Sequence, residues 1–169
     1  MLKGKFTILG IILFLFVSFS ESKAQVHKIQ ASFIVNFFRY IQWPEINGND
    51  FIVGVYGSGH EMYQELNDKI AGQRYRNSNI KVIEVSNIED ASACLILYLP
   101  MGKSYLNKKI VDVLKNSSTL IITEEQEWVP SHSVINFKVV DQKLTFSINQ
   151  KNAQERQLAI NSKLIALAR

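Results

Sequence analysis

Two short segments of the sequence are apolar at nearly every position, Phe51–Tyr56 and Ala93–Leu99. Each is followed by turn residues, Gly57-Ser58-Gly59 and Pro100-Met101-Gly102, so both are too short to be buried helices. A strand is apolar at nearly every position when both of its faces are covered, because neither set of alternating side chains then meets water. The sequence therefore predicts a sheet with helices on both faces.

The remaining elements follow from apolar spacing. Spacings of three and four predict helices over residues 26–41, 61–70, 104–114 and 149–169. Further strands are predicted over residues 79–85 and 119–123, and alternation over 135–139 and 144–148 around Asp141-Gln142 predicts a β-hairpin. We expect a three-layer α/β/α domain on a mixed sheet of about five or six strands, ending in this hairpin and one long helix.

Residues 1–24 have the layout of a cleavable signal peptide. Two lysines precede an apolar run, Phe6–Phe19, which is shorter than the roughly 20 residues that cross a bilayer. The small residues Ser22 and Ala24 stand at positions −3 and −1 of a predicted cut before Gln25. An exported single domain over residues 25–169 is predicted, and an uncleaved N-terminal anchor is the alternative.

Charge and cysteine content narrow the class of protein. The precursor carries +4, and removing residues 1–24 takes away three of 19 basic and one of 15 acidic residues, which leaves +2. A charge this small, spread along the chain, argues against a nucleic-acid partner. Cys94 is the single cysteine, so no disulfide can form within the chain, and we expect it to be a small buried hydrophobe.

Few residues suggest chemistry. The segment Gly57-Ser58-Gly59 follows a predicted buried strand and opens a predicted helix, where backbone N–H groups can hold an anion. It is the candidate site of a small-ligand binding module, although a simple strand-to-helix turn is the favoured explanation. The histidines His27, His60 and His132 lack metal-ligand spacing, so no metal or other cofactor is expected. An envelope hydrolase ranks last, because no nucleophile–base motif is visible.

Surplus apolar and aromatic residues suggest a protein partner. Candidate contact residues are Tyr40, Trp43, Trp128, Leu158 and Ile165. The first and last predicted helices are apolar over more than one face, which suits core burial, a homodimer or a membrane-protein partner.

Short motifs along nearly the whole mature chain resemble the YfiR family of periplasmic proteins. They are Ala31, Asn36-Phe37, Trp43-Pro44, Val55-Tyr56-Gly57, Cys94-Leu95-Ile96-Leu97, Leu120-Ile121-Ile122-Thr123, Ile135-Asn136-Phe137, Phe146-Ser147-Ile148-Asn149, and Ala153, Leu158, Ser162, Leu164, Leu167 and Ala168. Two features depart from the family pattern. Cys94 has no partner cysteine, and Ser131-His132-Ser133 stands where a glycine is usual.

The resemblance implies a regulator without enzymatic activity. Family members inhibit an inner-membrane diguanylate cyclase through its periplasmic sensor part, and so control cyclic di-GMP and biofilm formation. An outer-membrane lipoprotein can sequester the inhibitor, and members tend to form homodimers. A sensor histidine kinase is the alternative membrane partner. On this basis we expect a periplasmic regulatory protein.

Overall fold

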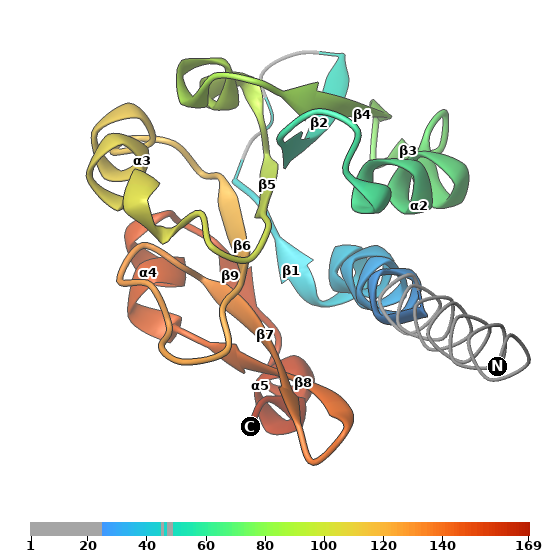
Figure 1. The fold of residues 1–169 in the computed structure, drawn as a ribbon. Coiled ribbons are helices and arrows are strands. Elements are labelled where there is room, and N and C mark those ends of the chain that lie inside the picture. The colour runs from blue at the N-terminus through green and yellow to red at the C-terminus, as the bar shows by residue number, and fades with distance from the viewer. Residues whose placement is uncertain (1–24, 45, 47–48) are drawn as a thin grey trace, which may run out of the picture.

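The computed structural model describes residues 25–44, 46 and 49–169. The predicted signal peptide, residues 1–24, lies outside these residues. A curled seven-stranded sheet has the order β3-β4-β2-β5-β6-β7-β8 (Figure 1). Its strands are β2 (Asp50–Tyr56), β3 (Arg74–Tyr75), β4 (Ser78–Val85), β5 (Ile96–Leu99), β6 (Leu120–Glu124), β7 (Ile135–Val140) and β8 (Lys143–Ile148). Within the described part of the chain, every helix is too short or too polar to cross a bilayer.

The sheet is mixed, as expected, with a parallel centre. Strands β4, β2, β5, β6 and β7 run parallel, whereas β3 and β8 pair antiparallel at the two edges. The predicted C-terminal hairpin is confirmed as β7 and β8, joined through Asp141 and Gln142, which both have positive φ. The sheet has more strands than the expected five or six because Arg74–Tyr75 folds back on β4. Arg76 (φ 53°) forms the tight turn between them.

The three-layer arrangement is confirmed. Along β5, Ile96 and Tyr98 contribute to one core, and Leu97 and Leu99 to the core on the opposite face. The helix over residues 25–40 and α2 (Glu61–Ile70) cover the first face. The second face is covered by the 3-10 helix Ile88–Ala93 and by α3 (Asn107–Val113), which follows the 3-10 turn Ser104–Leu106.

Four phenylalanines join the helix 25–40 to the hairpin. Phe33 and Phe37 come from the helix, Phe137 from β7 and Phe146 from β8. The Phe37 ring centroid lies 5.6 Å from that of Phe146 and 6.1 Å from that of Phe137, within the range of favourable aromatic pairs. This cluster holds the helix against the last strands of the sheet.

The prediction of one long C-terminal helix is wrong. The segment forms α4 (Gln150–Glu155), the short strand β9 (Ala159–Ile160) and α5 (Ser162–Leu167). Gln157 adopts a φ of 57°, which a continuing helix does not allow. Strand β9 pairs antiparallel with β1 (Ile41–Gln42), so its backbone groups bond across the chain instead of along a helix.

Cys94 is buried as predicted, with 2% of its surface exposed, and burial, aided by Asp90, raises the pKa of its thiol to about 12. It packs against Gly54 in the central strand β2. A Cβ atom at Gly54 would lie 2.6 Å from Cys94 Sγ and 2.8 Å from Val85 Cγ2. Glycine at this position therefore allows close packing between β2 and the segment that leads into β5.

We expect Gly54→Ala to lower the free energy of unfolding by about 1–3 kcal/mol, because the added methyl group overpacks the core. Urea unfolding of the variant and the wild type measures this. The double variant Gly54→Ala/Cys94→Ala removes the sulfur that clashes and should recover part of the loss. A single variant as stable as the wild type would contradict the packing argument.

Candidate functional site

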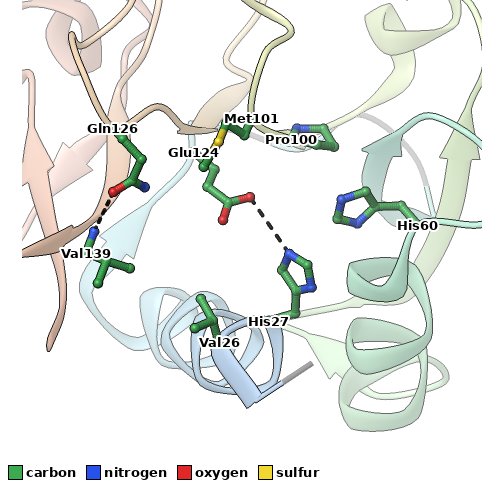
Figure 2. Close-up of a pocket in the computed structure, with 8 residues that line it drawn as sticks. All are labelled: Val26, His27, His60, Pro100, Met101, Glu124, Gln126 and Val139. Carbon is green, nitrogen blue, oxygen red and sulfur yellow. Dashed lines mark hydrogen bonds and ion pairs between the residues drawn. The ribbon is translucent and has the colours of Figure 1, made fainter. Parts of the chain in front are cut away.

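A pocket of about 390 Å³ opens at the carboxyl ends of the central parallel strands (Figure 2). It is lined by Val26, His27, His60, Pro100, Met101, Glu124, Gln126 and Val139. His60 follows β2 and Pro100 follows β5, and these neighbouring strands are where the chain changes direction across the sheet. Open α/β sheets bind ligands at such a switch point, and the volume lies within the range of small-molecule sites.

Glu124 forms the floor of the pocket at the end of β6. It shares a face of the strand with Leu120 and Ile122, and so points toward the helix 25–40. Its Oε2 accepts a hydrogen bond of 2.8 Å from the Tyr98 hydroxyl, and its Oε1 accepts one of 3.2 Å from Gln30 Nε2. Tyr98 is fully buried, and burial and then the Glu124 charge raise its pKa well above the usual range.

Two histidines face Glu124 from the other side of the pocket (Figure 2). His27 Nδ1 lies 2.9 Å from Glu61 Oε2, and His27 Nε2 lies 3.8 Å from Glu124 Oε2. The His60 ring centroid is 5.0 Å from that of His27. His60 also caps α2, because its Nδ1 accepts a hydrogen bond from the backbone N–H of Met62.

The surroundings move the pKa values of the two histidines in opposite directions. The carboxylate of Glu124, together with that of Glu61, raises the pKa of His27 against the opposing effect of burial. Burial, and then the neighbouring His27, lowers the pKa of His60. Burial by itself would raise the pKa of Glu124, but His27, Tyr98 and Gln30 together outweigh it and lower that pKa. The site therefore favours a protonated His27, a neutral His60 and an ionised Glu124.

We expect Glu124→Gln to lower the free energy of unfolding by about 1.5–3 kcal/mol, because hydrogen bonds to a charged group are lost from a mostly buried site. Chemical denaturation near neutral pH measures the loss. The double variant Glu124→Gln/Tyr98→Phe should lose less than the sum of the two single variants, because both remove the same hydrogen bond. Additive losses would contradict the network.

The predicted ligand turn lies beside this pocket, next to His60, and two of its three backbone donors already have partners. Gly57 N–H donates to Val85 O at 3.0 Å, and Gly59 N–H donates to the carboxylate of Glu84. Gly57 and Gly59 both have positive φ, which explains the choice of glycine. Ligand binding by Gly57, Ser58 and Gly59 stays a prediction.

The candidate contact residues lie at different depths. Trp43 and Leu158 are only 3% and 4% exposed, and Trp43 Nε1 donates a 3.1 Å hydrogen bond to Leu95 O. Tyr40 and Ile165 are partly buried. Trp128 is 50% exposed, so among these five residues it is the one that presents a large apolar surface to a partner.

Sequence reasoning missed Glu124, Met101 and Val139 as members of one site. The signals that could have found them were a carboxylate after a buried strand and a histidine directly after a glycine turn. Each of these signals is weak by itself. The sequence also does not show that they belong to one site, because residues such as Gln30 and Glu124, whose side chains are hydrogen-bonded, are 94 positions apart. In the described residues, no three His, Cys, Asp or Glu side chains are grouped to hold a metal ion.

The fold and the pocket define a three-layer α/β domain with a ligand-sized site at the switch point of its parallel strands. The chain belongs to the YfiR/HmsC-like family, whose model matches residues 27–169. This confirms the resemblance drawn from the short motifs, and it supports a role as a regulator in signalling. No curated protein sequence matches the chain.

Proposed function

We propose that this protein is a non-enzymatic periplasmic regulator that binds and represses the periplasmic sensor part of an inner-membrane diguanylate cyclase. The observation that carries the proposal is the family match over residues 27–169. The sequence of residues 1–24 supports export, because it has the layout of a cleavable signal peptide. The output of such a regulator is the level of cyclic di-GMP and, through it, biofilm formation.

Repression follows from preferential binding. If the regulator binds the inactive state of the sensor more tightly than the active state, it shifts the population toward the inactive state. To change the ratio of inactive to active sensor from about 1:99 to about 99:1, the regulator must bind the inactive state roughly 10⁴-fold more tightly than the active state. An outer-membrane lipoprotein that binds the same regulator would release the sensor by competition. A homodimer would present the contact surface twice.

Exposed aromatic side chains are the strongest candidates for the contact, because buried aromatic anchors dominate many protein interfaces. Trp128 is 50% exposed and is our first choice of contact residue. Tyr40 and Ile165 are only partly buried and are further candidates on other parts of the surface. Tyr105 is 70% exposed and serves as a matched control, because it is another large exposed aromatic residue, in the 3-10 turn Ser104–Leu106.

The test is a pull-down of the C-terminally tagged full chain from detergent-solubilised cell envelope, followed by mass spectrometry. Enrichment of a diguanylate cyclase supports the proposal, and enrichment of a sensor histidine kinase moves the repressed partner to that class. We expect Trp128→Ala to reduce recovery at least about tenfold and Tyr105→Ala to leave it within about twofold. A preparation with no membrane signalling protein would overturn the proposal.

A second candidate function is a small-ligand binding module. The pocket of about 390 Å³ with Glu124, His27 and His60 at the switch point favours it. Binding of a ligand to the purified protein would test this function directly, and the chemistry of the pocket narrows the choice of ligand.

A further inference from the structure

The pocket presents hydrogen-bond donors that are not used within the described part of the protein. His60 Nδ1 accepts the Met62 N–H at 3.1 Å, so the imidazole proton of neutral His60 is on Nε2. Gln126 Oε1 accepts the Val139 N–H at 2.9 Å, which assigns the NH₂ group to the other position of the amide. Both residues line the pocket, and no described residue accepts a hydrogen bond from either nitrogen.

His27 adds a third donor. Its Nδ1 is engaged by Glu61 at 2.9 Å, whereas its Nε2 is 3.8 Å from Glu124 Oε2. That separation is an ion pair but too long for a hydrogen bond. The N–H of Nε2 is therefore available to an acceptor that enters the pocket.

The acceptor already present, Glu124, is largely used. Tyr98 and Gln30 donate to its two oxygens, and His27, which also pairs with Glu61, offsets part of its charge. A cationic ligand would have to compete with these groups. An anionic acceptor would instead meet three donors, on His27, His60 and Gln126.

The walls of the pocket are apolar. Val26, Pro100, Met101 and Val139 line it, and Met101 and Val139 are 51% and 42% exposed. Val139 lies on the same face of β7 as Phe137, which packs against Phe33 of the helix 25–40. These side chains form a hydrocarbon-lined mouth above the polar floor, as Figure 2 shows for Val26, Met101 and Val139 around Glu124.

We propose that this pocket binds a small organic carboxylate, whose charged group accepts hydrogen bonds from His27, His60 and Gln126 and whose hydrocarbon part packs on Val26, Met101 and Val139. This inference rests on the second candidate function and deepens it by naming the class of ligand, and it requires no protein partner. The pull-down can fail while the ligand binds, and the reverse also holds.

Octanoate is the probe, with octan-1-ol and octylammonium as controls that keep the hydrocarbon part and change the head group. Titration calorimetry with the protein purified from the cell envelope measures the three affinities. We expect octanoate to bind at least about tenfold more tightly than either control, because only its head group matches the three donors. No binding of octanoate, or equal binding of the three compounds, would overturn the proposal.

Two substitutions test the donors and keep an acceptor for the backbone N–H groups that Gln126 and His60 bind. Gln126→Glu keeps an acceptor for the Val139 N–H and replaces the NH₂ group by a carboxylate oxygen. His60→Asn keeps a helix cap, since asparagine is a preferred N-cap residue, and removes the Nε2 donor. Each should weaken octanoate binding at least about tenfold. Gln154→Glu, the same charge change on the exposed surface of α4, should leave it within about twofold.

The pH dependence gives a separate readout. The groups that face His60 are His27, Glu61, Glu124, Lys103 and the ring of Tyr98. Burial, and then His27, lowers the pKa of His60 in the free protein against the opposing effect of Glu124 and Glu61. A bound carboxylate would favour protonated His60, so binding should take up protons and tighten about three- to tenfold from about pH 7.5 to about pH 6. This gain should be absent in His60→Asn. Unchanged or weaker binding by the wild type at the lower pH would contradict the role of His60.

Discussion

Replacing Phe37 by alanine should lower the free energy of unfolding by about 3–5 kcal/mol. The Phe37 side chain is completely buried in the aromatic cluster that joins the helix 25–40 to β7 and β8. Its removal leaves a cavity that Phe33, Phe137 and Phe146 border, and these rings are held by other contacts and can close the cavity only in part. A domain of this size has a total stability of roughly 5–15 kcal/mol, so the loss is a large fraction of it.

Urea unfolding followed by circular dichroism measures the change, with an unchanged denaturant slope as the sign of a simple stability effect. Leu167→Ala is the control, because Leu167 is 62% exposed and its truncation should change stability by less than about 0.5 kcal/mol. The loss of unfolding free energy for Phe37→Leu should lie between those for Phe37→Ala and Leu167→Ala. A loss below about 1 kcal/mol for Phe37→Ala would show that the cluster does not anchor the helix.

The stability of the wild type should fall by about 3 kcal/mol from pH 6.5 to pH 4 through His132 alone. His132 is 4% exposed, and its Nδ1 lies 2.6 Å from Asn107 Oδ1. Its Nε2 is buried and has no hydrogen-bond partner among the described residues. Burial, and then the charge of Arg156, lowers the pKa of His132 from 6.5 to about 4.

The sign follows from proton binding. Below pH 6.5 the unfolded chain binds a proton at His132 that the folded protein binds only near pH 4, so lower pH favours unfolding. The slope reaches about 1.4 kcal/mol for each pH unit in the middle of this interval and is about half of that at its two ends. His27, whose pKa is raised, contributes in the opposite sense, since its stabilisation is complete below 6.5 and is lost as the pH rises through its folded pKa.

The His132→Asn variant isolates this contribution. Asparagine can still donate to Asn107 Oδ1 but does not titrate, so the difference in stability between wild type and variant should change with pH. Denaturation curves at several pH values between about 6.5 and 4.5 measure that difference, and Leu167→Ala should keep the wild-type slope. A pH-independent difference between wild type and His132→Asn would show that His132 titrates normally in the folded protein.

The site was harder to predict than the elements that carry it. His27 and His60 are noticeable in the sequence, but their relation depends on the packing of the helix 25–40 beside α2. Glu124 opens the acidic run Glu124-Glu125-Gln126-Glu127, whose composition favours a solvated loop. Alternation along β6 instead turns Glu124 toward the core, where Tyr98 and Gln30 bind it. Trp43 was a candidate contact residue from its sequence alone, and its burial was decided by Phe38, Phe51 and Tyr75 around it.

The sequence by itself determined the order of the longer helices and strands as far as residue 148, the two-sided burial of the central strands and the C-terminal hairpin. These features depend on local periodicity and on turn residues, which act over a few positions. Only the tertiary structure decided the break in the C-terminal segment, because strand β9 exists through its pairing with β1. It also decided the pocket, since the groups that line it come from the ends of elements far apart in the chain and meet only when parallel strands end at one edge of the sheet.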